Sequence, residues 1–346
     1  MKAFRRLARE KRAAHLVDIS TPIPKENEVL LRVAYCGICG SDLHAWLNHK
    51  GYESVLPEVT FGHELSGVVA EIGSSVKDWG IGDRAVMIAL QAHHDDNDPY
   101  CAIGLPQLST RRRVQGLHLD GGMAEYVCVE EEFLLPIPEG LDLETAALTE
   151  PLSVAEHCIG NRTSIGSGDK VIVSGPGIIG LLCAISARSR GAEVIISGTE
   201  RDEATRLSAA RTLGFETLVV GPEEPPLSEQ ISAYFSEGAN ALVEASGSVH
   251  ALADAWQSVR PNGTVTAVAL YSRNIDFEIT QFIRKQIDLR TSYASSRNDY
   301  LNALKLLQDG TIDSSVLTQS YPLVNAEEGF IDSENLDVTK VIVNCS

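Results

Sequence analysis

The stretch KVIVSGPGIIG, residues 170–180, decides the fold of this chain. It joins a strand-like apolar run to a helix-like apolar run through a glycine-rich turn. Gly175, Gly177 and Gly180 have the G-x-G-x-x-G spacing of dinucleotide-binding turns. In such turns the first glycine makes the bend, the second lets the backbone approach a pyrophosphate, and the third packs the helix against the strand. The stretch therefore predicts a nucleotide-binding turn.

The helix after this turn begins with Ile178 and Ile179. Its first N–H groups have no partner within the helix, and its N-terminus carries a partial positive charge. Both properties favour a bound phosphate, so we count these two residues with the cofactor-binding turn. A glycine-rich turn without a ligand is the alternative, and five further strand patterns downstream count against it.

Strand-like and helix-like runs alternate from residue 170 to residue 294. The strand-like runs show little polar alternation, so they predict a parallel sheet covered by helices on both faces. Six of them fit a doubly wound α/β dinucleotide-binding fold, the Rossmann fold. These runs are KVIVS (170–174), EVIIS (193–197), TLVV (217–220), ALVEAS (241–246), TVTAVAL (264–270) and DLRTSYA (288–294).

The first third of the chain has a different pattern. Short apolar or alternating runs are separated by Gly, Pro and Asp, which predicts an irregular β domain. At residues 141–162 the apolar period becomes helical, with a break expected near Pro151. Near the C-terminus, LNALKLLQDG (301–310) predicts a helix that ends at glycine, and KVIVNC (340–345) predicts a final strand.

The residues after the second strand of the sheet bear on the choice of nucleotide. NAD-binding versions place Asp or Glu at this position to hold the ribose 2′-OH, whereas this chain has Gly198 there. Thr199 and Arg201 could receive a 2′-phosphate, which favours NADP. Glu200 could instead bind the ribose of NAD. We predict an NAD(P) cofactor with a slight preference for NADP.

The overall charge excludes one class of partner. The chain has 346 residues and a formal net charge of -18, whereas binding to nucleic acid needs a surplus of Lys and Arg on some face. No apolar run approaches the roughly 18 residues that a membrane span needs, and the charged N-terminus does not resemble a secretory signal. The odd number of cysteines, seven, argues against a disulfide framework. We expect a cytoplasmic protein with no nucleic-acid or membrane partner.

A second stretch, YCGICGSDLH (35–44), contains two cysteines three residues apart. A zinc finger needs a second ligand pair at finger spacing, and a redox Cys-x-x-Cys needs a thioredoxin-like unit; the sequence predicts neither. The chain instead continues with GHE (62–64) and, much later, EPLSVAEH (150–157). A thiolate, an imidazole and carboxylates can form a four-coordinate zinc site with one exchangeable position, which is typical of catalytic zinc.

These motifs, in this order, resemble those of zinc-dependent medium-chain dehydrogenases, in the polyol (sorbitol) and threonine branch of the alcohol dehydrogenase superfamily. The resemblance extends over nearly the whole chain, through MKAF, CGICGSDLH, GHELSGVVAEIG, GDRAV, GGMAEY, EPLSVAEH, GPGIIG and the C-terminal strand. It implies a GroES-like irregular β-barrel catalytic domain, residues 1–155 and 295–346. A Rossmann NAD(P)-binding domain, residues 156–294, is then inserted between these segments.

The resemblance also implies the metal ligands. Cys39, the cysteine of CGSD, corresponds to the zinc thiolate and His63 to the second ligand, while Cys36 is a buried bystander. Glu64 and Glu150 match the acidic ligands of this branch, in which one carboxylate binds zinc and the other can exchange with it. The alternatives are that Glu64 is an ordinary strand carboxylate and that Glu150 caps a helix.

Further roles are implied by the same resemblance. Asp42 would accept the second N–H of His63 and fix its tautomer. Ser41 and His44 resemble the family's proton relay, and with Glu64 they form the predicted catalytic set. The implied reaction is the reversible oxidation of a secondary alcohol (a polyol, sugar alcohol or threonine-like alcohol) to its ketone. Zinc serves as Lewis acid and NAD(P) takes the hydride.

Two other classes of function remain open. A zinc-free reductase of the quinone or enoyl type shares this fold but needs no metal ligands, so the ligand set counts against it. A non-enzymatic nucleotide-binding protein could also keep the fold, and a turnover assay separates it from an enzyme. For an enzyme, the partner is a small-molecule alcohol or ketone, and the family implies a homo-oligomer, either a tetramer or a dimer.

One departure from the alcohol dehydrogenase pattern concerns a structural zinc. That family carries four closely spaced cysteines after the GDRV-like strand, whereas between residues 91 and 120 this chain has only Cys101. We therefore predict one catalytic zinc and no structural four-cysteine site. Substitute ligands could come from a charge-rich loop, although such loops are usually solvated: His93, His94, Asp95, Asp96 and Asp98.

Overall fold

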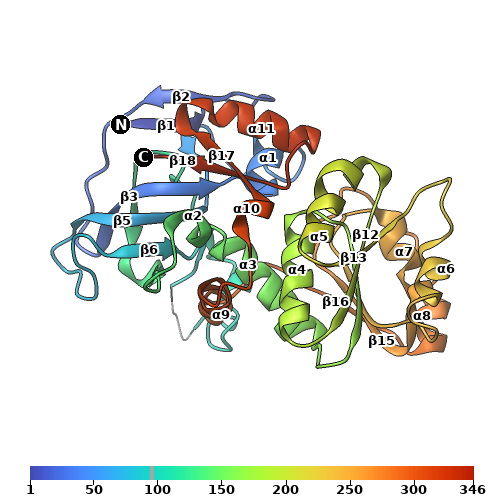
Figure 1. Cartoon of the computed structure of the whole chain (residues 1–346). Helices are drawn as coiled ribbons and strands as arrows, with labels where there is room; N and C mark the ends of the chain where they lie inside the picture. The colour runs from blue at the N-terminus through green and yellow to red at the C-terminus, as the bar shows by residue number, and fades with distance from the viewer. Residues whose placement is uncertain (94–96) are drawn as a thin grey trace. The chain divides into compact units, whose positions relative to one another are not determined.

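The computed structural model describes residues 1–93 and 97–346 (Figure 1). It divides into two compact units, Met1–Ser153 with Ser296–Ser346, and Val154–Ser295. Helix α3 (Thr149–Glu156) contains the first of the boundaries between them.

The first unit is built mainly from short strands. These are β1 (Lys2–Arg6), β2 (Ala14–Asp18), β3 (Glu28–Gly37), β4 (Val59–Thr60), β5 (Glu64–Ile72), β6 (Arg84–Met87), β7 (Leu90–Gln91), β8 (Arg113–Val114), β9 (Tyr126–Glu130), β10 (Leu134–Pro136), β17 (Thr318–Pro322) and β18 (Lys340–Asn344). Its other helices are α1 (Gly40–Trp46), α2 (Leu143–Ala146), α9 (Arg297–Gln308), α10 (Ser314–Leu317) and α11 (Ala326–Asn335).

Strand β3 organises this unit. It lies in a seven-stranded sheet of order β10-β6-β5-β3-β18-β17, with β9 also paired to β3. Its partners β5, β9 and β18 are all antiparallel to it, and β18 comes from the C-terminal end of the chain. Separate small sheets, β2-β1-β4 and β7-β8, complete the unit. The irregular β fold predicted for the first third of the chain is confirmed.

The second unit contains one parallel sheet of order β13-β12-β11-β14-β15-β16. The strands are β11 (Lys170–Ser174), β12 (Glu193–Gly198), β13 (Glu216–Val219), β14 (Ala239–Glu244), β15 (Val259–Ala267) and β16 (Asp288–Thr291). The helices are α4 (Ile178–Ser189), α5 (Ser208–Thr212), α6 (Leu227–Ser232), α7 (Val249–Ser258) and α8 (Ile279–Lys285). Helices α4 and α5 lie on one face of the sheet, and α6, α7 and α8 on the other (Figure 1). The predicted doubly wound α/β sheet of six strands is confirmed.

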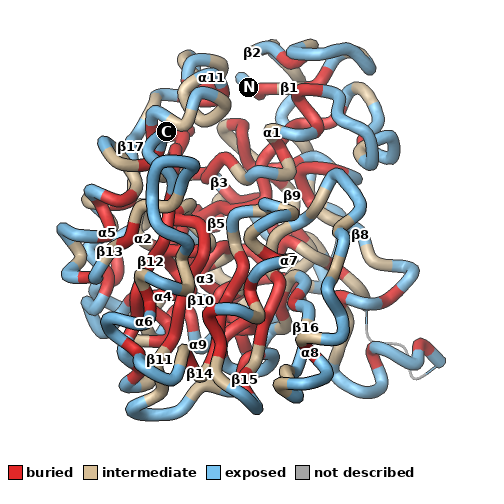
Figure 2. Tube along the Cα trace, turned by 90° about the vertical axis from the view of Figure 1, so that its right-hand side faces the viewer, coloured by how far each residue is buried: buried red, intermediate tan, exposed pale blue. Residues whose placement is uncertain are grey.

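Apolar burial explains why these strands form. In Figure 2 the tube is buried along β3 and β5 in one unit and along β11 and β14 in the other. Four of the five residues of β11 are buried, which accounts for its unbroken apolar run. Helix α4 is buried from residue 180 to residue 187, so it forms part of the core of its unit rather than a surface layer.

The helical region predicted at 141–162 is divided in three. Helix α2 ends at Ala146, α3 begins at Thr149, and a π-helical segment comes next at His157–Thr163. Pro151 lies in the first turn of α3, where its missing N–H has no helical partner to lose. The break therefore precedes this proline. Within residues 1–93 and 97–346, no helix has the length and apolar character to cross a membrane.

Candidate metal and nucleotide sites

Cys39 occupies the junction between β3 and α1. It is the N-cap residue of α1, with an extended backbone at φ -87 and ψ 155. Its backbone N–H donates to Oδ2 of Asp42 at 3.1 Å, which ties the start of the helix together. The position of the thiol is therefore fixed by the strand before it and by the helix after it.

Asp42 also holds the next candidate ligand. Its Oδ1 accepts the N–H of Gly62 at 3.4 Å and lies 3.4 Å from Nδ1 of His63. The Asp42 side chain is fully buried. Gly62 has φ +97, a region that favours glycine. Because Asp42 lies at Nδ1, the other ring nitrogen, Nε2, is the one available to a metal.

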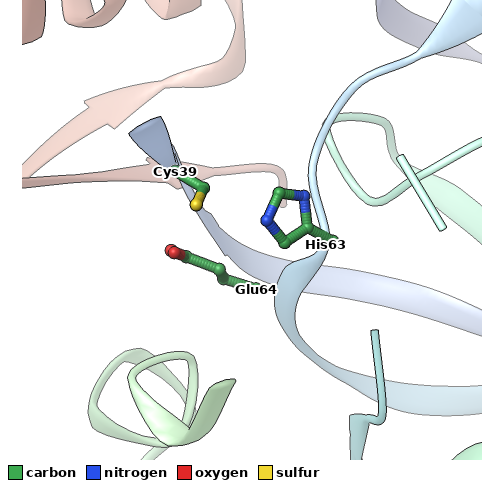
Figure 3. Close-up of side chains that lie close together, drawn as sticks. All are labelled: Cys39, His63 and Glu64. Atoms are coloured by element: carbon green, nitrogen blue, oxygen red, sulfur yellow. The ribbon is translucent and has the colours of Figure 1, made fainter. Parts of the chain in front are cut away.

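Three of the four predicted ligands converge. One ligand atom each from Cys39, His63 and Glu64 lies within 4.8 Å of the others, and His63 and Glu64 are buried. In Figure 3 the sulfur, a ring nitrogen and the carboxylate face a common space. A buried thiol, imidazole and carboxylate form a donor set that suits zinc, and three protein ligands leave a fourth position open. The residues present therefore fit a catalytic zinc ion.

The local charges reinforce this assignment. Burial lowers the pKa of His63, but Asp42 and Cys39 both raise it, and the net pKa lies well above the ordinary value. A metal that binds this ring must displace its proton. Metal binding at this cluster is therefore expected to release protons.

The fourth predicted ligand, Glu150, lies outside the group of converging atoms. It is in the first turn of α3, and its pKa is raised to about 7. Burial is the largest cause; Glu64 raises the pKa further, while His63 and Lys340 lower it. Glu150 is thus within electrostatic reach of the cluster, as an exchanging carboxylate would be, although it is not one of the three converging groups.

Lys340 was missed by the sequence reasoning. It is the first residue of β18, is buried, and forms an ion pair with Oε2 of Glu64. Its Nζ also donates to the carbonyl oxygen of Ile38 at 2.8 Å. The only signal in the sequence is a lysine at the start of an apolar strand, and that pattern is ordinary.

The predicted relay residues lie in the same unit but are not joined. Ser41 Oγ lies 3.3 Å from Nε2 of His63. His44 Nδ1 is hydrogen-bonded to Nδ1 of His49 at 2.8 Å, and its ring stacks on Tyr52 with centroids 5.5 Å apart. Among the described residues no hydrogen bond connects Ser41 with His44. Burial, and then His49, lower the pKa of His44, so its ring is neutral near pH 7.

The glycine-rich turn has the geometry that its motif predicts. Gly175 has φ +105, and a Cβ there would come within 2.6 Å of the backbone nitrogen of Ser246. A Cβ on Gly180 would collide with the carbonyl oxygen of Gly175. Gly177 is the N-cap of α4, and a Cβ there would meet no atom within 4 Å. Protein atoms therefore fill the space beside Gly175 and Gly180, whereas the space beside Gly177 is free. Ile178 and Ile179 follow Gly177 and begin the helix.

The end of β12 has Gly198 where an acid is expected, and Glu200, two residues later, is exposed. Gly198 ends the strand, and the carboxylate of Asp202 accepts both the N–H and the hydroxyl of Thr199, at 2.9 and 2.8 Å. Arg201 is exposed at this end of the strand. Arg206 lies 3.7 Å from Asp202, and its Nε has no hydrogen-bond partner among the described residues. Cationic groups therefore border the position where a ribose would bind.

A second group of side chains that could bind a metal consists of His93, Glu130 and Glu132. His93 belongs to the charge-rich loop after β7, which the sequence offers as a source of substitute zinc ligands. His93 approaches Glu132 at 2.6 Å and Glu130 at 3.5 Å, but His93 and Glu132 are exposed. Exposed acidic groups often gather without an ion, so we assign no metal here. Oδ2 of Asp98 accepts a hydrogen bond from the Ser109 hydroxyl at 2.6 Å, so this carboxylate stabilises the loop. His94, Asp95 and Asp96 lie outside the described residues.

Two family models match the chain. The model described as alcohol dehydrogenase GroES-like domain matches residues 25–139, and the model described as zinc-binding dehydrogenase matches residues 179–309. The first match contains Cys39, His63 and Glu64. The second begins beside the glycine-rich turn and includes the end of β12.

Individual proteins resemble the chain over most of its length. It is 33% identical over 325 residues to a sorbitol dehydrogenase of Halalkalibacterium halodurans, which is 93% of each chain. It is 32% identical over 322 residues to a D-arabitol-phosphate dehydrogenase of Enterococcus avium, 91% of this chain and 89% of that one. A zinc-binding dehydrogenase fold from Sinorhizobium meliloti 1021, solved bound to NADP, superposes with a TM-score of 0.90 at 27% identity and covers 99% and 98% of the two chains.

Proposed function

The chain belongs to the zinc-type medium-chain alcohol dehydrogenase family and is an NAD(P)-dependent oxidoreductase, and we propose that it interconverts polyol-like secondary alcohols and their ketones. The observation that carries the proposal is the convergence of Cys39, His63 and Glu64 within 4.8 Å. The substrate class rests on relatives named for sorbitol and D-arabitol phosphate.

The proposed metal site uses Cys39, His63 and Glu64 as ligands, with Glu150 as the carboxylate that can exchange with Glu64. Zinc, when bound, supplies a Lewis acid that lowers the pKa of a substrate hydroxyl. Asp42 keeps the His63 ring oriented through its contact at Nδ1. NAD(P) supplies the hydride acceptor, and Gly175, Gly177, Ile178, Ile179 and Gly180 would hold its pyrophosphate.

Proton removal is assigned to Ser41 and His44. The Ser41 hydroxyl lies beside the His63 ring, where it can accept the proton of a bound alcohol. The neutral His44 ring can take that proton onward and pass it to solvent. Because Ser41 and His44 share no hydrogen bond in the part of the chain that the structure describes, the relay needs a bridging hydroxyl, which a substrate or a water could provide.

NADP is the proposed preferred cofactor. Gly198 removes the acidic residue that would hold a ribose 2′-OH, and the nearby Asp202 carboxylate is engaged by Thr199. Arg201 and Arg206 offer charge to a 2′-phosphate, and Thr199 borders the same position. The similar S. meliloti protein was solved with NADP, which supports this choice.

Several broader proposals go with this function. We infer a catalytic metal domain of residues 1–155 and 295–346 and a nucleotide domain of residues 156–294. We also infer a homo-oligomer (a tetramer or a dimer) and a cytoplasmic location. Size-exclusion chromatography coupled to light scattering measures the oligomeric state directly.

The test is absorbance at 340 nm with polyols, threonine and simple secondary alcohols, each with NAD and with NADP. Every reaction is repeated after treatment with a zinc chelator. We expect turnover of a polyol that the chelator abolishes, with a higher kcat/KM for NADP.

Two outcomes would contradict the proposal. Full turnover after metal removal would favour a zinc-free reductase. No turnover of any alcohol by protein that contains zinc would favour a non-enzymatic nucleotide-binding role.

A further inference from the structure

The buried ion pair between Lys340 and Glu64 lies directly at the proposed metal site. The two side chains are each 2% exposed, and one of them belongs to the converging ligand group. A buried charge needs a partner, and Lys340 has two acceptors: the Glu64 carboxylate and the Ile38 carbonyl. The ion pair is therefore part of the buried site and not a solvent-exposed contact.

Backbone pairing fixes the lysine at this place. Strand β18 pairs antiparallel with β3, with Ile342 opposite Gly37, and the N–H of Ile38 donates to the carbonyl of Val341 at 3.0 Å. A Cβ on Gly37 would collide with Oε2 of Glu64 and approach Cε of Lys340 at 3.0 Å. A glycine at this position thus leaves room for the two side chains to meet.

The ammonium group of Lys340 lies among the negative charges of the proposed metal site. Asp42, Cys39, Glu64 and Glu150, when ionised, contribute four negative charges, of which a divalent zinc ion offsets two. The ammonium of Lys340 offsets one more. Zinc and Lys340 are, however, both attracted to the same Glu64 carboxylate, in a medium with little water to screen the charges.

We propose that Lys340 is a positioning residue that competes with the metal for Glu64, weakens the bond between this carboxylate and zinc, and so makes the third ligand position exchangeable. The inference rests on the zinc site of the proposed function. It explains how Glu64 and Glu150 can alternate at one metal: when Glu64 leaves zinc, its ion pair with Lys340 stabilises the free carboxylate, and Glu150 can take its place. Lys340 does not touch the substrate and acts on the metal through its ion pair with Glu64.

The experiment measures how fast zinc leaves the protein. Purified zinc-loaded wild type, K340M, K340R and E64Q are mixed with a chromogenic chelator, and the release rate is followed by absorbance. We expect K340M to release zinc ~10-fold more slowly than wild type, a factor that corresponds to about 1.4 kcal/mol in barrier height. K340R keeps the charge and should release zinc at a rate close to that of wild type.

A double-mutant cycle separates this role from a purely structural one. Because Lys340 acts through Glu64, adding K340M to E64Q should leave the release rate of E64Q unchanged. An equal slowing in both backgrounds would overturn the proposal, since the lysine would then act as a distant charge. Faster release from K340M would also overturn it, because the lysine would then support the metal site rather than compete with it.

Two controls keep the test decisive. Circular dichroism checks that each variant is folded, and K340Q, whose amide can still donate to the Ile38 carbonyl, replaces K340M if the latter does not fold. The cobalt-substituted proteins provide a second readout, because the d–d spectrum should change between wild type and K340M but not between E64Q and its double variant. If wild type binds no zinc, the proposed function fails; if it binds zinc and K340M releases it at the wild-type rate, only this inference fails.

Discussion

Cys36 and Cys39 lie three residues apart but in different surroundings. Cys36 is fully buried in β3, with its sulfur 3.8 Å from the carbonyl of Gly37, whereas Cys39 faces His63 and Glu64 at the start of α1. The Cys-x-x-Cys spacing is therefore shared by one packed thiol and one candidate ligand. Alanine at each position distinguishes these roles.

We expect Cys39→Ala to lose bound zinc and alcohol turnover, because a thiolate ligand is removed. Cys36→Ala should keep both and lower the free energy of unfolding by roughly 1 kcal/mol, since it removes only a small buried group. Zinc per chain by mass spectrometry and turnover at 340 nm provide the measurements. Equal zinc loss in both variants would show that Cys36 is also needed at the site.

A second prediction concerns the paired rings of His44 and His49. Burial and the neighbouring His49 both hold the pKa of His44 below its ordinary value. His49→Gln removes the second effect, so the pKa of His44 should rise. Since His44 accepts a proton only when neutral, the acid limb of the kcat/KM profile for alcohol oxidation should move to higher pH.

The matched control for that profile is His250→Gln, an exposed histidine on α7. Its acid limb should coincide with that of wild type. A limb that stays in place in His49→Gln would mean that His44 does not carry the proton.

Single residues also mark the limit of what the sequence could predict. Cys39, His63 and Glu64 were predictable because their types and order resemble a known pattern. Lys340 was not, because its contact with Ile38 joins residues 302 positions apart and depends on the pairing of β18 with β3. No local pattern contains that information.

At the scale of elements, the sequence predicts that a strand is present more reliably than it predicts where the strand begins and ends. The apolar run at 264–270 indicated a strand, but β15 begins at Val259 and includes Pro261, Asn262 and Gly263. These three residues are typical of a turn. The ladder between β14 and β15 instead absorbs them as a bulge, with a register shift between Ala239 and Ala241. Whether a turn-like segment ends a strand or bulges within it depends on the neighbouring strand.

The β11–α4 turn allows a test of binding separate from packing. A Cβ at Gly177 meets no protein atom within 4 Å, so Gly177→Ala should keep the melting temperature of wild type. It should weaken NADP binding by ~10-fold or more, about 1.4 kcal/mol, because the methyl group occupies the space that the pyrophosphate needs. Calorimetric titration with NADP and a thermal melt measure the two effects.

Gly180→Ala provides the contrast within the same turn. Its Cβ collides with the carbonyl of Gly175, so we expect a loss of about 1–3 kcal/mol in unfolding free energy from overpacking. If Gly177→Ala binds NADP as tightly as wild type, the turn does not hold the cofactor in the proposed way.

For the whole molecule, the two kinds of site belong to different compact units. Cys39, His63, Glu64 and Lys340 all lie in Met1–Ser153 and Ser296–Ser346, whereas the glycine-rich turn and the end of β12 lie in Val154–Ser295. Each unit has its own sheet or sheets and its own buried core. A ligand that binds the native state stabilises the region it contacts, and local opening of that region then becomes rarer.

Hydrogen exchange read by mass spectrometry should therefore resolve the two ligands by location. Removing zinc with a chelator should speed exchange in β3, α1, the start of β5 and β18, and leave β11 and the start of α4 unchanged. Adding NADP should slow exchange in β11, α4 and the end of β12, including in protein without zinc. If zinc removal speeds exchange equally in both units, the metal stabilises the chain as one cooperative unit. The proposal that one unit binds the metal and the other binds the nucleotide independently would then be wrong.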